Sequence, residues 1–457
     1  MTPKRSPNCP HQLQVLNFQP TDVTPCAIVR LLGLTSPSRS LSCPDPEFIT
    51  LTLKGTSRQL PARRRFKALL EVAEGRNDVI LQFGCRRLEV RLDHVPPNSL
   101  FTVLPLYVIC AGHSGEFQAP PTENCDPQSA CRRIHLASKL LQTFTAEKLQ
   151  ETGLGRRTFT LEDRCHVFRS ALPAEEARRM SQEALWTRIG TSSNSPPPPA
   201  LTSRVPGRDI MRSPLRSQRR KYLAFLSCTR YDGLRFTSEL TTHEDALKIT
   251  EAYVALGGGG LALFGSASLH SWPEAFEEIA PRFLDATPID PRHLLDDSCY
   301  RGTLGASFST TLGAVLHELF HCFDLGHSRG GVMGRGFDQI SRFYVCADEG
   351  EEAEGDRTPL ERSCAVLLAY HRWLGGSAGA AREVSLVYDA HSGAVKATAG
   401  IRVVELRRRE DQLIGRSWTF EGRVLRHFFQ LPPEARLAPF LLVVEDNCGN
   451  ILKQEAQ

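Results

Sequence analysis

Short apolar runs separated by turn residues fill the region from residue 46 to residue 122. Phe48–Leu53, Val79–Phe83 and Leu88–Leu92 are compact or alternate between apolar and polar positions, and Phe101–Cys110 is a longer apolar run. Alternation with a period of two is the pattern of a half-buried strand. Strands that recur roughly every 8–12 residues, with Gly, Pro and Asn between them, predict a small β-sandwich-like domain over residues 46–122.

The pattern changes to a helical spacing after Pro127. Apolar residues then predict a helix from about Gln128 to Thr152, ended by Gly153. Thr158–Leu161 and Lys221–Leu226 follow as strands. Helices that alternate with buried strands predict an α/β domain, which we place at residues 123–380.

Four consecutive glycines at 257–260 separate another helix from another strand. The helix is expected to begin at Thr242 or His243 and to end at Leu256, and the strand is Leu261–Gly265. No Gly-Lys-Ser/Thr follows the glycines and no helix comes directly after them, so we expect a turn and not a phosphate-binding loop.

Two polar stretches interrupt the α/β region. Residues 190–220 contain four consecutive prolines and a cluster of arginines, which predicts an exposed, disordered insertion. Residues 347–358 are rich in Asp and Glu, which predicts a solvated loop. Further helices are predicted at 272–284 and 359–374.

The two ends of the chain have different patterns. Residues 1–45 are rich in Pro, Ser and Cys and predict a poorly ordered segment with one strand near Leu13–Phe18. Residues 381–457 return to strands and predict a C-terminal β-sandwich-like module, in which Arg407–Asp411 would lie in an exposed hairpin turn. The predicted fold class is therefore α+β, with a β module on each side of the α/β domain.

Composition limits the functions that fit this chain. Its 457 residues, 41% hydrophobic and 23% charged, are typical of a globular protein with two to four domains. A net charge of +4 does not indicate binding to nucleic acid. No apolar run is long enough for a membrane span, and the polar start lacks the apolar core of a secretory signal, so we expect a cytoplasmic protein. The 14 cysteines form no Cys-x-x-Cys pair, so most are expected to be reduced thiols.

The candidate catalytic and metal-binding residues lie between His317 and His327, a stretch that reads H-E-x-x-H-x-x-D-x-x-H. His317 and His321 are one helical turn apart and share a face, so both can ligate one metal ion. His327 is far enough along the chain to return as a third imidazole. Three histidine nitrogens with one open position are typical of a single catalytic Zn²⁺.

Glu318 directly follows the first histidine of this motif. It is expected to take a proton from water as general base and to pass it to the leaving amine as general acid, while zinc polarises the carbonyl. The predicted activity is that of a zinc metalloendopeptidase acting on a peptide or protein substrate. Hydrolysis of a non-peptide amide would use the same site. The alternative is a non-catalytic binding or scaffold protein with a structural or relic zinc site, whose β modules bind partner proteins.

The motif resembles that of the metzincin zinc proteases, H-E-x-x-H-x-x-G-x-x-H followed by a methionine turn. Met333 lies six residues after His327, an interval similar to that of the matrixin branch. The phrase G-V-M-G-R-G-F-D at 331–338 is most similar to a eukaryotic family of predicted intracellular zinc metalloproteinases. The resemblance implies a metzincin-like catalytic domain at 123–380 with a twisted mixed sheet and an active-site helix. It also implies that Met333 forms a hydrophobic floor beneath the three ligands without binding the metal.

Asp324 stands where the metzincin motif has its turn glycine. Glycine suits that position because the chain leaves the helix sharply, often in a left-handed conformation. Aspartate is among the residues that tolerate this conformation, and Gly326 can share the bend. We expect zinc binding to persist, with Asp324 in the turn or supporting a ligand. The alternative is that its carboxylate approaches the metal.

Some further residues are candidates for roles around this site. Cys322 is expected to be a buried thiol. Three residues are candidates for support of the transition state, the last by a hydrogen bond to the oxyanion: His293, His371 and Tyr344. Three N-terminal cysteines are candidates for a structural zinc site or for a thiolate latch on the catalytic zinc, although their surroundings match neither motif: Cys9, Cys26 and Cys43.

Overall fold

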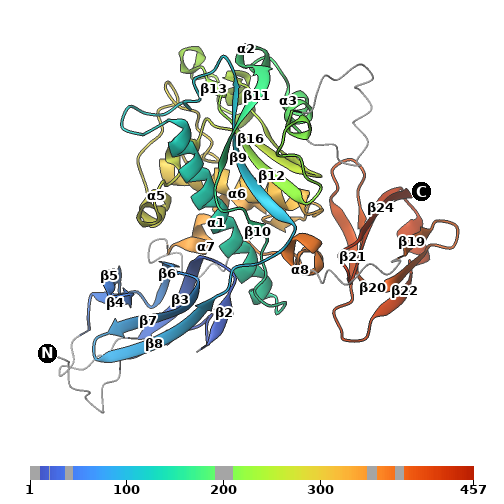
Figure 1. Cartoon of the computed structure of the whole chain (residues 1–457), viewed down its shortest axis with the longest axis horizontal. Coiled ribbons are helices and arrows are strands. Elements are labelled where there is room, and N and C mark those ends of the chain that lie inside the picture. Colours follow the sequence, from blue (N-terminus) through green and yellow to red (C-terminus); the bar gives the residue numbers. More distant parts are fainter. Residues whose placement is uncertain are drawn as a thin grey trace.

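The computed structural model describes residues 11–19, 21–36, 45–190, 209–346, 358–375 and 385–456 (Figure 1). An N-terminal β module, a central α/β domain and a C-terminal β module follow one another along the chain. Figure 1 shows the two β modules on opposite sides of the central domain. The mixed helices and sheets agree with the predicted α+β class. No helix in these residues is both long and apolar enough to cross a membrane.

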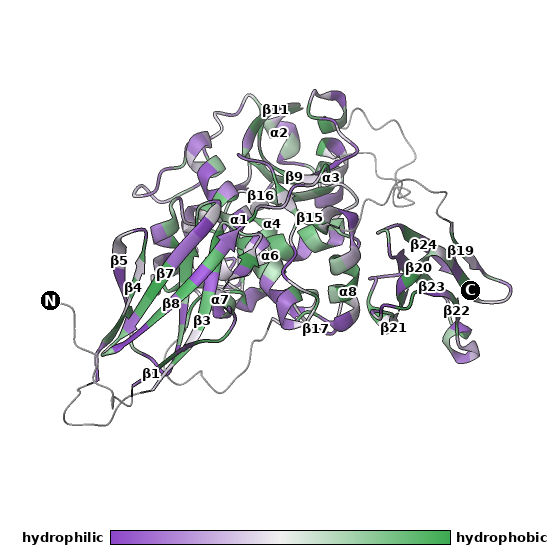
Figure 2. Cartoon of the chain, turned by 60° about the horizontal axis from the view of Figure 1, so that its bottom comes forward, coloured by the Kyte–Doolittle hydropathy of each residue, from purple (hydrophilic) through white to green (hydrophobic). Residues whose placement is uncertain are grey.

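Two sheets packed on one core make up the N-terminal module. Their strand orders are β1-β3-β6 and β2-β8-β7-β4-β5. The strands are β1 (Gln12–Val15), β2 (Asp22–Thr24), β3 (Ile28–Ser36), β4 (Phe48–Leu53), β5 (Thr56–Pro61), β6 (Arg65–Glu71), β7 (Gly75–Phe83) and β8 (Arg86–His94). Leu31 of β3, Leu51 of β4 and Leu81 of β7 belong to the shared core. Figure 2 shows hydrophilic and hydrophobic residues alternating along β7 and β8, as the sequence predicted.

Three strands of this module lie before residue 46. The strand expected near Leu13–Phe18 is present as β1, whereas the expectation of poor order is wrong for residues 21–36. β3 pairs along most of its length with β6, and its apolar pattern is flanked by the Pro-, Ser- and Cys-rich stretches that suggested disorder. Residues 1–10, 20 and 37–44 lie outside the described part. Cys85 is disulfide-bonded and so departs from the expected reduced thiols.

A mixed sheet forms the middle layer of the central domain. β9 (Thr102–Ala111), β12 (Arg220–Leu226) and β16 (Leu261–Gly265) are parallel neighbours, and β15 (Ala255–Gly258) closes one side antiparallel to β16. On the other side β10 (Thr160–Leu161) and β11 (His166–Pro173) both pair with β9.

The strand β9 corrects the predicted boundary between the first two domains. Its sequence was assigned to the β-sandwich over residues 46–122, but it is the strand around which the central sheet is built. Side chains on both of its faces are buried, as in a parallel sheet that is covered by helices on both sides. From the sequence alone, a continuous apolar run of this kind fits either a strand of a β-sandwich or a strand of a covered parallel sheet.

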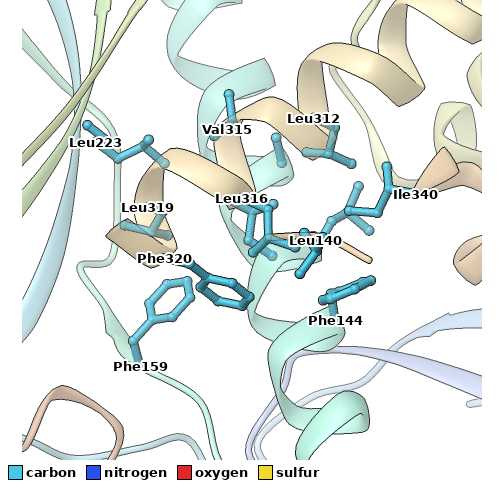
Figure 3. Packing of buried hydrophobic residues seen from close by; sticks show 14 of the residues in the cluster. Leu140, Phe144, Phe159, Leu223, Leu312, Val315, Leu316, Leu319, Phe320 and Ile340 are labelled. Atoms are coloured by element: carbon cyan, nitrogen blue, oxygen red, sulfur yellow. The ribbon is translucent and has the colours of Figure 1, made fainter. Parts of the chain in front are cut away.

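Helices cover both faces of the central sheet. α1 (Pro127–Glu151), α6 (Leu304–Cys322) and α8 (Arg362–Tyr370) share a core with one face, while α2 (Ala174–Ala177) and α3 (Gln182–Ile189) pack on the other. α1 confirms the helix predicted from Gln128 to Thr152. Figure 3 shows Leu312 and Leu316 of α6 gathered with Leu140 and Phe144 of α1. This packing turns the apolar side of α6 inward and leaves its other side for the histidines.

The prediction of a helix that ends at Leu256 is wrong for the second half of that segment. α4 (His243–Lys248) is followed by β14 (Thr250–Glu251) and then by β15, which contains the first two glycines of the run. A Cβ atom added to Gly257 would lie 2.0 Å from the Glu318 carbonyl oxygen. Glycine therefore allows the outer strand of the sheet to lie directly against the backbone of α6. The helices predicted at 272–284 and 359–374 are shorter than expected, as α5 (Ile279–Phe283) and α8.

Part of the predicted disordered insertion is ordered. Asp209 accepts a hydrogen bond from Ser170 and pairs with Arg188 at 2.8 Å, and Ile210 is fully buried. The prediction is therefore wrong for residues 209–220. Residues 191–208 and the acidic residues 347–357 lie outside the described part.

Six strands connected through one long strand form the C-terminal module. β20 pairs with β19, β21, β22 and β23, and β24 pairs with β23, so all six strands belong to one connected sheet. Their bounds are β19 (Leu386–Asp389), β20 (Ala394–Arg407), β21 (Ile414–Thr419), β22 (Arg426–Gln430), β23 (Phe440–Asp446) and β24 (Ile451–Ala456). Val404 and Val444 face the module's own core, whereas Val403 and Val443 belong to the core of the central domain. The sheet is therefore packed onto the domain that carries the histidines.

Candidate metal centre

Helix α6 places His317 and His321 one turn apart near its C-terminal end. The helix begins after Thr303, whose hydroxyl accepts a hydrogen bond from the Ala306 amide at 3.3 Å. It ends at Cys322, a fully buried thiol as expected. The chain then turns at Asp324, which has a φ of 66°. Aspartate thus takes the left-handed conformation for which the metzincin motif uses glycine.

The turn brings His327 back to the two helical histidines. The Nε2 atom of His321 lies 3.0 Å from that of His317 and 3.0 Å from that of His327, and the remaining pair is 3.2 Å apart. Three nitrogens bound to one tetrahedral zinc ion at about 2.0–2.1 Å would lie about 3.3 Å from one another. The three imidazoles therefore fit the donor set and the spacing of a zinc ion.

The second nitrogen of each imidazole is held by a backbone carbonyl. Nδ1 of His317 donates to Val332 O at 2.8 Å, Nδ1 of His321 donates to Leu325 O at 2.9 Å, and Nδ1 of His327 donates to Asp411 O. Because a carbonyl only accepts hydrogen bonds, Nδ1 must carry the proton and Nε2 must present its lone pair. Burial lowers the pKa of His317 to about 4 and that of His321 to about 3, which keeps both rings neutral at pH 7.

Met333 lies in the segment that supports this arrangement. Its carbonyl accepts a hydrogen bond from the Ser328 amide at 2.8 Å, and its side chain is buried in the core of the central domain. The preceding residue, Val332, provides the carbonyl that orients His317. The sequence-based placement of Met333 beneath the ligands stays a prediction.

The C-terminal module holds the third histidine. The His327 amide donates to Gln412 O at 3.1 Å, and the Ile414 amide donates to His327 O at 2.9 Å. Together with the bond from Nδ1 to Asp411, the β20–β21 turn thus contacts His327 on both its backbone and its side chain. Reading the sequence missed this support, since a backbone carbonyl has no signature in residue type.

Asp324 joins the turn between His321 and His327 to the same module. Its carboxylate lies 2.6 Å from Lys453 Nζ and 3.4 Å from His371 Nε2, and its carbonyl accepts a hydrogen bond from Arg407 at 2.7 Å. Burial alone would raise the pKa of Asp324, but the hydrogen bond from His371 and the charges of Lys453 and Lys221 hold it well below its ordinary range. The carboxylate is engaged by these groups and does not join the three Nε2 atoms.

Arg407 is fully buried and corrects the expectation of an exposed charged turn. It pairs with Glu405 at 2.5 Å, and both side chains are inaccessible to solvent. A Cβ atom on Gly326 would lie 2.7 Å from the guanidinium Nε, so Arg407 packs directly on the turn between His321 and His327. Only the later residues of the run, such as Arg408, are exposed.

The structure also shows where the other residues suggested as oxyanion donors, supporting groups or thiol ligands lie. The Tyr344 hydroxyl donates to Leu140 O at 2.6 Å inside the core, so it is not an oxyanion donor. His293 is on the surface, whereas His371 is buried against Asp324. Cys26 is buried with Thr143 and Glu147 of α1 as neighbours, which places its thiol away from the three histidines. Cys9 and Cys43 lie outside the described residues.

Glu318 lines a cavity of about 300 Å³. Burial raises the pKa of its carboxyl to about 7, although a hydrogen bond with the Gly257 backbone lowers it in part. A carboxyl group with such a pKa can both accept and release a proton near neutral pH. The site therefore combines three nitrogens spaced to hold a metal ion with an acid–base group that lines a cavity.

Comparison with known proteins shows the family to which the chain belongs. Residues 40–194 and 204–366 match the model of a family described as "putative peptidase family". The match spans more than half of the chain, and the protein belongs to this family. The matched residues include the three histidines and Glu318 and end before the C-terminal module.

Two curated relatives have names that specify the metal. A protein of Schizosaccharomyces pombe named "putative zinc metalloproteinase" is 28% identical over 307 residues, which cover 61% of this chain and 45% of the relative. A protein of Saccharomyces cerevisiae with the same description is 26% identical over 307 residues, which cover 61% of this chain and 42% of the relative. The chain thus spans less than half the length of the curated relatives that it matches.

Among solved structures, the chain is similar to catalytically inactive OgpA from Akkermansia muciniphila in complex with an O-glycopeptide substrate. The identity is 12% and the TM-score 0.40, over 79% of this chain and 93% of that chain. A likeness at this level carries no argument about fold or function.

Replacing Asp324 with asparagine is expected to lower stability while zinc binding persists. Asparagine also tolerates the left-handed turn, but it loses the charge that pairs with Lys453. Because this pair is partly exposed, we expect a loss of about 1–2 kcal/mol in the free energy of unfolding. The pKa of Asp324 is depressed in the folded protein. The full difference in the free energy of unfolding between the two proteins should therefore be seen above about pH 4. This difference should disappear as the pH falls further.

Chemical denaturation of both proteins between pH 3 and pH 7, with zinc content measured in parallel, tests this prediction. Equal stability of the two proteins at pH 7 would contradict the role given to the charge. Loss of zinc from a folded Asp324→Asn variant would indicate that the carboxylate is itself a ligand.

Proposed function

We propose that the protein is a zinc-dependent endopeptidase of the metzincin type. His317, His321 and His327 would hold the zinc ion, and Glu318 would act as general base and general acid. The observation that carries this proposal is the convergence of the three Nε2 atoms at 3.0–3.2 Å, with Glu318 on the same helix beside a cavity. When bound, the ion would supply Lewis-acid chemistry, polarising a peptide carbonyl and making water a stronger acid.

Glu318 would move the proton in this reaction. Its carboxylate would accept a proton from the attacking water and then donate that proton to the amine that leaves the cleaved bond. A pKa raised to about 7 by burial suits both steps, because neither form of the carboxyl group is strongly disfavoured at neutral pH. Gly257 supports this position, since it lets β15 lie against the helix backbone at Glu318.

The metzincin assignment rests on the spacing of the ligands and on Met333. The third histidine follows a left-handed turn at Asp324, and Met333 is buried next to the carbonyl that orients His317. Under this proposal Met333 supports the ligands and does not bind the metal. The expected substrate is a peptide or protein, in keeping with the peptidase family to which the chain belongs.

Cleavage of a mixed peptide library tests the proposed function. We expect internal peptide bonds to be cut by the zinc-loaded protein, cleavage to stop when a chelator removes the metal, and activity to return when zinc is added back. No cleavage by a folded, zinc-loaded protein would contradict the proposal. Cleavage that is unaffected by complete removal of zinc would contradict the role of the metal.

A further inference from the structure

The cavity beside Glu318 is lined mainly by apolar side chains. It extends along α6 and toward the sheet, with a volume of about 300 Å³. Its walls include Phe225, Phe264, Trp272, Leu295, Val315 and Phe337. A volume at the low end of the range for small-molecule pockets is suited to one long side chain.

Asp297 is the second carboxylate that lines this cavity. Among the described lining residues, Glu318 is the other carboxylate, and no lysine or arginine is present. The Asp297 side chain is 17% exposed and pairs with Nδ1 of His243 at 3.8 Å, beyond hydrogen-bond distance. No hydrogen bond reaches this carboxylate from any residue that the structure describes. A largely buried acid without a hydrogen bond is costly unless a ligand satisfies it.

We infer that this cavity receives a substrate side chain next to the scissile bond and that Asp297 makes it selective for lysine or arginine. The apolar walls suit the methylene stem of such a side chain, and the carboxylate suits its cationic end. Two carboxylates in a lining that has no lysine or arginine, and in which His243 is the one basic side chain, attract a positive group and repel Asp or Glu. Burial also raises the pKa of Asp297, a cost that a bound cation would offset. This inference rests on the proposed peptidase function, because Glu318 joins the cavity to the reacting bond.

Peptide libraries that vary each residue flanking the scissile bond test the selectivity. For the zinc-loaded wild type, kcat/KM is expected to be at least about tenfold higher for lysine or arginine than for norleucine at one flanking position, and lowest for glutamate. In Asp297→Asn the preference for the cation over norleucine should disappear. Asp290→Asn is the matched control, since it removes a more exposed carboxylate from the same loop, where it pairs with Arg292. It should retain the preference.

A binding measurement separates failure of this inference from failure of the peptidase proposal. Binding of Nα-acetyl-arginine amide and Nα-acetyl-norleucine amide to the zinc-loaded wild type can be compared by NMR, which needs neither cleavage nor a variant. The arginine amide is expected to bind about tenfold more tightly or better. If this preference holds while no library peptide is cut, the pocket assignment stands and the peptidase proposal fails. If peptides are cut without preference for a cation, or the two amides bind equally, the assignment of Asp297 is overturned.

Discussion

Glu318→Gln is expected to lower kcat for peptide hydrolysis by about 10²–10⁴-fold and to leave the zinc content unchanged. Glutamine has nearly the same shape as glutamate but cannot take a proton from water, and general acid–base catalysis is worth about that factor. Zinc should be retained because backbone carbonyls orient the three imidazoles through their Nδ1 atoms, and Glu318 takes no part in holding them.

Rates on a cleaved library peptide and zinc content measured on the same preparations test this expectation. Glu183→Gln is the control, since it removes an exposed carboxylate at the start of α3, and it should behave as wild type. Wild-type rates in Glu318→Gln would exclude the carboxylate as the proton carrier. Loss of zinc from the folded variant would make Glu318 a ligand and contradict the three-histidine site.

Arg407→Ala is expected to destabilise the protein by about 3–5 kcal/mol, the cost of breaking a buried ion pair and leaving one charge unpaired. Glu405 would stay buried without its cation, and the carbonyl of Asp324 would lose a hydrogen bond. Zinc affinity is also expected to fall by about 10–100-fold, because Arg407 packs on the turn that positions His327.

A second variant separates stability from positioning. Leucine at both Glu405 and Arg407 removes the two charges together, so much of the stability should return, whereas zinc affinity should stay low. Arg423→Ala removes an exposed arginine of the same module and should change neither property. Denaturation curves and competition with a chelator give the two measurements. Wild-type zinc affinity in the double variant would show that Arg407 does not position the site.

The local parts of the site were accessible from the sequence. His317 and His321 are fixed by the period of one helix, and the place of His327 follows from a short turn. The helix α1 was predicted because its apolar residues recur at helical spacing along its 25 residues. These apolar residues are buried in the main core. Asp324 was expected in the turn because it stands where the metzincin motif has its glycine, and aspartate is among the residues that tolerate a positive φ.

The non-local parts were not accessible in the same way. Asp411 lies 84 residues after His327 and contributes through its backbone carbonyl, which any residue type could provide. Arg407 was expected in solvent because a run of charged residues usually is, and only the packing of β20 on the central domain buries it. The strand β9 was assigned to the wrong domain because burial on both faces removes the alternation that marks a sandwich strand.

The central claim is that three imidazoles and no thiol bind zinc in this protein. Zinc K-edge X-ray absorption on the purified full chain tests it most directly. The site described here predicts one zinc ion with three histidine nitrogens at about 2.0–2.1 Å and one further light ligand. Zinc with sulfur ligands at about 2.3 Å, or a folded protein that binds no zinc, would contradict it.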